Sequence, residues 1–273
     1  MHLALPRCHT ATVETLAPDG TVIGWDEAGS GPALLLVHGA TATGAAWNPV
    51  RALLPGGIRV AAMDRRGRGQ SGGGAALDYS LEVEADDILA VAAALGGGVV
   101  VAAHSVGATI TLRALLRSGD LIKAAVLYEP PILKIPPADA MHTALAAGQP
   151  EQARIAFLRS VVEMSGDDIE AFRAAPTWAR SVELMWTVDR EHSALRALDS
   201  DLSQYRGVHQ PIRLLVGSHG SPHQVEGVAA LAAVLPHAET TVLEGQGHGA
   251  LVQGPALVAS AIAEVLQETN RVA

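Results

Sequence analysis

One short segment, in which an apolar run leads through a serine into a helical pattern, constrains the fold of this 273-residue chain most. Residues 99–102 are continuously apolar, as is typical of a buried strand. Ala103, Ser105 and Gly107 follow at alternate positions, and helical spacing begins directly after them. Small residues two before and two after a serine let a strand turn sharply into a helix. The pattern predicts an α/β sheet with Ser105 raised at its edge, although alanine replaces the usual first glycine.

The rest of the chain alternates short β-rich runs with helical stretches, the pattern of a doubly wound, mostly parallel sheet. Residues 10–16 and 21–26 flank a Pro-Asp-Gly turn signal at 18–20 and predict an antiparallel hairpin. Further strands are expected at 33–37, 58–63, 99–102, 122–128, 212–216 and 239–243.

Residues 131–208 interrupt this alternation. Strand-like runs disappear there, and amphipathic helical segments replace them. They are expected near 138–147, 151–164, 167–174 and 177–198. A helical stretch inserted between two strands predicts a cap over the strand ends. We therefore expect two units: a core made of residues 1–130 and 209–273, and a cap insertion made of 131–208.

Composition excludes several classes of function. A net charge of −9 without long like-charge blocks argues against nucleic acid as a partner. No run of about 18 apolar residues is present, so no membrane span is expected, and the first ten residues lack the pattern of a signal peptide. Cys8 is the single cysteine, which precludes an internal disulfide and favours a cytoplasmic setting. Histidines and carboxylates do not pair at metal-ligand spacing, so neither a metal nor another cofactor is expected.

Chemistry-bearing residues follow the predicted strands, where doubly wound sheets bind their ligands. Ser105 is suited to act as a nucleophile, and His248, in a glycine-rich loop after the last strand, is suited to accept its proton near neutral pH. The backbone amides of Val106 and Ala40 would form an oxyanion hole. The alternatives are that His248 is a surface histidine and that residues 38–40 are an ordinary turn, with His38 structural in either case.

Four segments in order resemble the α/β-hydrolase fold superfamily over essentially the whole chain. They are Leu-Leu-Val-His-Gly-Ala at 35–40, Asp-Arg-Arg-Gly-Arg-Gly-Gln-Ser at 64–71, His-Ser-Val-Gly at 104–107 and Gly-His at 247–248. The resemblance implies a central eight-stranded sheet and a Ser–acid–His triad. It also implies that the charges of loop 64–71 are structural.

The acid of the triad is expected at a less common place. In most of the superfamily it follows the seventh strand, where this chain has Gly220 and no Asp or Glu from 207 through 225. The sixth strand ends at Glu129, in a tract that resembles zearalenone lactonases and one branch of haloalkane dehalogenases. The resemblance implies that Glu129 orients His248 and stabilises its imidazolium. The alternative is that Glu129 braces the cap hinge beside two prolines.

Two tryptophans of the predicted cap are candidate substrate contacts. Trp178 stands in a Trp-Ala-Arg stretch that resembles the cap of zearalenone lactonases, and aromatic residues make up only 3% of the chain, which also draws attention to Trp186. The alternative is packing, which is the more frequent role of a tryptophan on an amphipathic helix. His219 and His223 are expected to be solvated loop residues.

The serine argues against dehalogenase and epoxide hydrolase chemistry, which uses aspartate at this position in the superfamily. We expect a cofactor-free serine hydrolase that cleaves a small-molecule carboxylic ester or lactone through an acyl-enzyme. Two alternatives stay open on the same fold: hydrolysis of a carbon–carbon bond, or a polyketide thioesterase or cyclase reaction. A third alternative is a ligand-binding receptor with little turnover. The sequence leaves the oligomeric state open.

Overall fold

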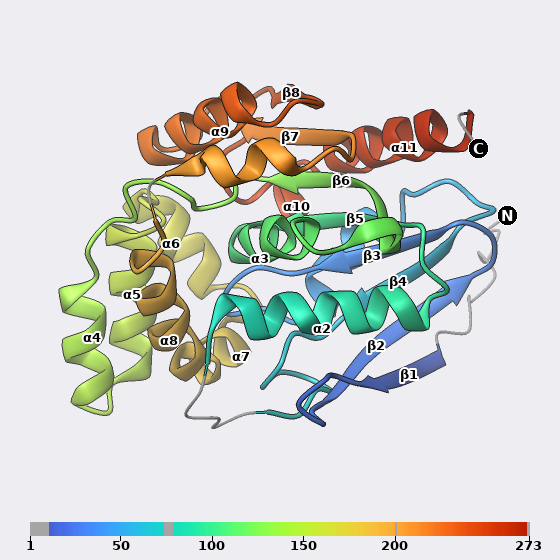
Figure 1. The fold of residues 1–273 in the computed structure, drawn as a ribbon. Helices are drawn as coiled ribbons and strands as arrows, with labels where there is room; N and C mark the ends of the chain where they lie inside the picture. Colours follow the sequence, from blue (N-terminus) through green and yellow to red (C-terminus); the bar gives the residue numbers. More distant parts are fainter. Residues whose placement is uncertain (1–10, 74–78, 200, 272–273) are drawn as a thin grey trace, which may run out of the picture.

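The computed structural model describes residues 11–73, 79–199 and 201–271, and it consists of one sheet with helices around it (Figure 1). The eight strands lie in the order β1-β2-β4-β3-β5-β6-β7-β8. β2 pairs antiparallel with β1 and β4, and the remaining neighbours are parallel. The predicted eight-stranded, mostly parallel α/β sheet is confirmed. The strands are β1 Ala11–Leu16, β2 Val22–Gly29, β3 Ala33–Val37, β4 Arg59–Met63, β5 Val99–His104, β6 Ile122–Tyr128, β7 Ile212–Gly217 and β8 Ala238–Leu243.

The predicted N-terminal hairpin is confirmed as the pair β1 and β2, from Ala11 to Gly29. Residue 10, which was expected to begin its first strand, lies outside the described residues, as does Cys8.

Helices cover both faces of the sheet because strand residues alternate between two apolar clusters. Leu35, Val37 and Val101 pack with helices α2, α3 and α9 on one face. Leu34 and Leu36 pack with α1, α10 and α11 on the other. The helices are α1 Asn48–Arg51, α2 Leu81–Ala94, α3 Val106–Leu115, α9 Pro222–Val234, α10 Ala250–Gln253 and α11 Pro255–Arg271, with the short 3-10 helices η1 Gly44–Trp47, η2 Gly119–Leu121 and η3 Leu202–Gly207.

Five further helices between β6 and β7 form what we call the helical insert, residues 139–196. They are α4 Asp139–Ala146, α5 Pro150–Ser160, α6 Gly166–Arg173, α7 Trp178–Glu183 and α8 Met185–Arg196. Most of their buried apolar residues form a third cluster, whereas Leu195 of α8 belongs to the first. Figure 1 shows them together at one end of the sheet. The single helix expected over 177–198 is two helices, because Leu184 between them has ψ near 0° and leaves the helical conformation.

Strand register places the predicted site at that same end of the sheet. β5 and β6 are parallel neighbours whose last residues, His104 and Tyr128, are register partners. Ser105 and Glu129 directly follow these two strands. Because parallel strands end at one edge, both residues begin side by side. Among the described residues, no helix has the length and apolar character needed to cross a membrane.

Candidate active site

Ser105 occupies a strained turn between β5 and α3. Its backbone has φ 55° and ψ −131°, in a region that residues other than glycine rarely adopt. The Ser105 amide donates to the Tyr128 carbonyl at 2.9 Å, which holds the turn on the sheet. A side chain at Gly107 would lie 2.4 Å from the His38 carbonyl oxygen, so close packing of α3 requires glycine. The first small position is satisfied by Ala103, which is fully buried in β5.

The loop after β3 approaches Ser105 from the other side. A Cβ atom on Gly39 would lie 3.0 Å from the Ser105 Cβ atom, so glycine permits this approach. The His38 ring braces the loop: its Nε2 accepts from the Arg65 amide at 3.0 Å, and its Nδ1 donates to the Gly39 carbonyl at 2.8 Å. Burial, and then the nearby Arg65, hold the pKa of His38 well below its usual range. The geometry agrees with a structural His38.

Glu129 is completely buried after β6 and has φ 44°. One of its carboxylate oxygens, Oε1, accepts a hydrogen bond from the Gly217 amide at 2.8 Å. The other, Oε2, lies 2.6 Å from His248 Nδ1. Both carboxylate oxygens are therefore engaged, one by the β7 backbone and one by the imidazole.

The glycine at position 220, after β7, is compatible with the position of the Glu129 carboxylate after β6. A Cβ atom at Gly220 would lie 3.0 Å from Glu129 Oε1 and 3.0 Å from the Gly217 carbonyl oxygen. The Glu129 carboxylate thus fills the space into which a side chain at Gly220 would point. Two acids cannot share that space without displacing one another.

The loop that carries His248 is held by two residues at the ends of β5 and β6. The Tyr128 hydroxyl donates to the Gly247 carbonyl and accepts from the Ala250 amide. His104 Nε2 lies 3.1 Å from the His248 carbonyl oxygen, and the two histidine rings are 4.5 Å apart between centroids. Burial, followed by the neighbouring His248, keeps the pKa of His104 well below its usual range, so this ring stays neutral.

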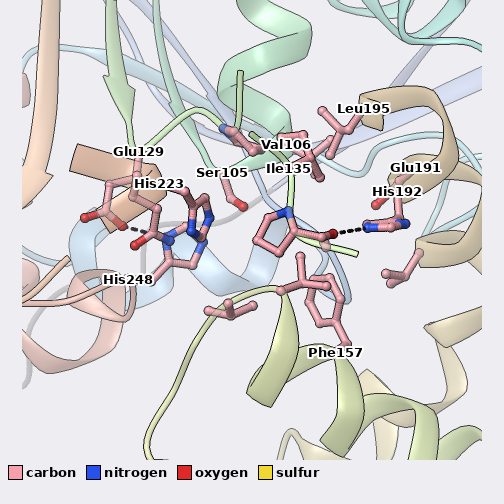
Figure 2. Close-up of a pocket in the computed structure, with 17 residues that line it drawn as sticks. Ser105, Val106, Glu129, Ile135, Phe157, Glu191, His192, Leu195, His223 and His248 are labelled. Carbon is pink, nitrogen blue, oxygen red and sulfur yellow. Dashed lines mark hydrogen bonds and ion pairs between the residues drawn. The ribbon is translucent and has the colours of Figure 1, made fainter. Parts of the chain in front are cut away.

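Ser105 stands between two cavities, a larger one of about 280 Å³ and a smaller one of about 40 Å³. Figure 2 shows the smaller cavity, with Glu129, His248 and Ser105 on one side and Glu191 and His192 on the other. Residues that line both cavities are Ala40, Ser105, Phe157, Val162 and His248. The structure thus brings the predicted nucleophile, base, acid and oxyanion-hole residues to one place, since Glu129 and Val106 also line the smaller cavity.

The two candidate tryptophans lie in different environments. Trp178 lines the larger cavity, and its indole N–H donates to Glu151 at 3.2 Å. Trp186 is 43% exposed. The guanidinium carbon of Arg190 lies 4.9 Å from the centroid of the Trp186 ring. In the part of the chain that the structure describes, it lines neither cavity. The structure does not support a substrate contact for Trp186, because α8 turns the neighbouring Met185 inward instead.

Sequence reasoning missed several cavity residues. His223 was expected in solvent, but its side chain is only 10% exposed, lines the smaller cavity and lies 3.2 Å from Glu163. The Gln224 amide nitrogen lies 2.8 Å from His248 Nδ1, while its Oε1 accepts from the Ser221 amide. The Ser-Pro-His-Gln run of residues 221–224 is a capping-box signal that would have placed both side chains at the start of α9.

A buried ion network joins loop 64–71 to the helical insert. Arg65 contacts Glu84 at 2.7 Å and Glu191 of α8 at 2.9 Å, and Arg68 also pairs with Glu191. Burial lowers the pKa of Arg65, and the carboxylates of Glu191 and Glu84 more than offset this. The structural role expected for the charges of this loop agrees with these contacts. Within residues 11–73, 79–199 and 201–271, no cluster of histidine, cysteine and carboxylate side chains is arranged to hold a metal ion.

Comparison with known proteins agrees with this geometry. Residues 34–261 match the model of the Alpha/beta hydrolase family. The chain belongs to this family. An N-formylmaleamate deformylase of Pseudomonas putida is 32% identical to the hydrolase over 231 residues, 81% of this chain and 83% of that protein.

Two further relatives support the assignment. A 2-(acetamidomethylene)succinate hydrolase of Mesorhizobium japonicum is 27% identical over 251 residues, 86% of this chain and 88% of that protein. The solved structure of an alpha/beta hydrolase from Sphaerobacter thermophilus is 29% identical, with a TM-score of 0.80 and coverage of 94% of this chain and 99% of that one. The chain is an enzyme of the hydrolase type, as predicted.

Proposed function

We propose that the hydrolase is a serine hydrolase with the triad Ser105, His248 and Glu129. The observation that carries this proposal is the 2.6 Å contact between Glu129 Oε2 and His248 Nδ1, in a cavity that Ser105 also lines. An ionised carboxylate only accepts hydrogen bonds, so Nδ1 carries the ring hydrogen and Nε2 is left as the acceptor. A neutral imidazole of this tautomer is the base that a serine hydroxyl needs.

The reaction then follows from the positions of the groups. Ser105 Oγ attacks the substrate carbonyl while His248 Nε2 takes its proton, and Glu129 stabilises the imidazolium that forms. The amides of Val106 and Ala40 hold the negative oxygen; Val106 is the first residue of α3, where helix amides lack an intrahelical acceptor. The imidazolium gives its proton to the leaving group, and water, activated by the same ring, releases the acid.

The substrate class is an acyl compound with a small acyl or leaving group. A carboxylic ester or lactone fits the acyl-enzyme chemistry. A second candidate is hydrolysis of an acylated nitrogen, which the name of the deformylase relative favours. The same triad serves both, since His248 can protonate a leaving oxygen or nitrogen. The helical insert acts as a cap in this proposal, because α5 and α8 supply the cavity walls opposite the sheet.

Replacement of Ser105 tests the proposal. We expect Ser105→Ala to lower kcat for p-nitrophenyl acetate by about 10³-fold or more, because the nucleophile is lost. We also expect a fluorophosphonate to label the parent enzyme at Ser105 in stoichiometric amount. Ser181→Ala is the matched control, since Ser181 lines the larger cavity but donates to the Trp178 carbonyl. Parent-like turnover by Ser105→Ala would overturn the proposal.

A further inference from the structure

Arg154 is a buried cation with no ionic partner among the described residues. It lies on α5, is 6% exposed and lines the larger cavity together with Ser105. Its Nε atom is buried and, within the described part of the chain, has no hydrogen-bond partner. Two aromatic rings lie near the side chain: its guanidinium carbon is 5.7 Å from the Phe157 ring centroid and 6.0 Å from that of Trp178.

The electrostatic environment of Arg154 differs from that of the other buried arginines. Burial alone lowers the pKa of Arg154, to about 10, so it is still charged at neutral pH. For Arg65, in contrast, two carboxylates more than offset the same effect of burial. A buried charge without a counter-charge is unfavourable, and proteins normally pair it. A counter-charge supplied by a ligand would satisfy this requirement.

We propose that Arg154 binds a carboxylate of the substrate in the larger cavity. The inference rests on the proposed function, because it places the anionic end of an acyl substrate at Arg154 while the carbonyl lies at Ser105. The ligand class is a small ester or amide that carries a carboxylate away from the bond to be cleaved.

The shape of the site suits this ligand. A guanidinium group binds a carboxylate through N–H groups in its own plane. Phe157 and Trp178 contact the guanidinium through their rings. Its Nε–H group has no acceptor among the described residues, so this group is available to the ligand. The smaller cavity is less suited to an anion, since the Glu191 carboxylate lines it. A volume of about 280 Å³ limits the ligand to a small molecule.

The test compares two pairs of esters, and in each pair one member carries an additional carboxylate. One pair, p-nitrophenyl butyrate and mono-p-nitrophenyl succinate, varies the acyl side; a second, phenyl acetate and 4-acetoxybenzoate, varies the leaving group. In at least one pair, we expect Arg154→Met to lower kcat/KM of the carboxylate ester about 10- to 100-fold relative to the neutral ester, mainly through KM. Arg154→Lys should retain part of the preference for the carboxylate ester, because lysine keeps the positive charge but not the two parallel N–H groups of the guanidinium.

Arg159→Met is the matched control, since Arg159 is an exposed arginine on the same helix. It should change the ratio of the two esters less than threefold. An unchanged ratio in both pairs for Arg154→Met, or an equal change with Arg159→Met, would overturn the inference. Thermal unfolding checks the fold: Arg154→Met should melt no lower than the parent, because it removes an unpaired buried charge.

A binding measurement separates this inference from the proposed function. Succinate should raise the melting temperature of Ser105→Ala but not of Ser105→Ala/Arg154→Met. This result needs no turnover, so it decides the role of Arg154 even if Ser105→Ala stays active and the proposed triad fails. If Ser105→Ala is inactive while succinate stabilises both variants equally, the triad stands and the carboxylate site is wrong.

Discussion

The sheet side and the insert side of the cavity satisfy their charged groups in different ways. On the sheet side, Glu129 is engaged through both carboxylate oxygens by groups of the same chain. On the insert side, Arg154 is also buried, but no described carboxylate pairs with it. In the proposed function, this difference means that the protein preorganises the reacting groups, whereas the ligand supplies the partner of the recognition group.

Another buried charge of the helical insert, Glu191, does have ionic partners. This α8 residue pairs with both Arg65 and Arg68 of the loop below it. The charge of Glu191 is therefore neutralised by the loop, whereas Arg154 in the larger cavity has no described ionic partner.

The largest effect is expected from Glu129→Gln on the sheet side. An amide cannot stabilise the imidazolium and permits the wrong tautomer of His248, so kcat should fall about 10³- to 10⁴-fold. Steady-state kinetics with p-nitrophenyl acetate measures this, with KM changed little. Glu163→Gln is the control, because the Glu163 side chain is itself exposed and contacts His223, which is outside the proposed triad, so kcat should change less than twofold. If Glu129→Gln keeps more than a tenth of the parent kcat, the proposed role of Glu129 as the acid of the triad is wrong.

The next largest effect is expected on stability, at the contact between α8 of the helical insert and loop 64–71. Glu191→Gln removes the charge that Arg65 and Arg68 share, so the free energy of unfolding should fall by about 3–5 kcal/mol. Urea unfolding followed by fluorescence measures it. Glu183→Gln breaks only an exposed pair with Arg180 on the insert and should cost less than about 1 kcal/mol. Equal losses in the two variants would contradict a buried link between insert and sheet.

The smallest effect is a dependence of stability on pH that comes from the sheet side. Burial depresses the pKa of His38 and of His104 in the folded state, whereas the unfolded rings titrate near pH 6.5. The unfolded chain therefore binds more protons below pH 6.5, and stability falls as pH falls from there. Each ring should contribute up to about 1.4 kcal/mol per pH unit.

Urea unfolding at pH 7.5 and 5.5 measures this dependence. His104→Asn should reduce the slope by removing one of the two rings. Exposed His209 serves as the control, since His209→Asn should leave the slope unchanged. Stability that rises on acidification in this range would contradict two neutral buried rings.

Much of the fold followed from local patterns. The apolar runs identified the central strands, because a strand buried on both faces has a distinctive sequence, and the turn signal at 18–20 identified the N-terminal hairpin. The family prediction is confirmed. The meeting of Ser105, Glu129 and His248 also followed from their places after strands, although their roles stay predictions, as does the finer resemblance to zearalenone lactonases. Trp186 shows the limit, since composition alone cannot tell which face of a helix meets the cavity.

The sequence by itself determined the strand-and-helix order and the sharp turn at Ser105, because these depend on residue types close together in the chain. Only the tertiary structure decided which charges of the insert find partners. Glu191 and Arg154 look alike in sequence, each a charged residue on an amphipathic helix. One meets two arginines and the other only aromatic rings, since burial and pairing depend on segments far apart in the chain.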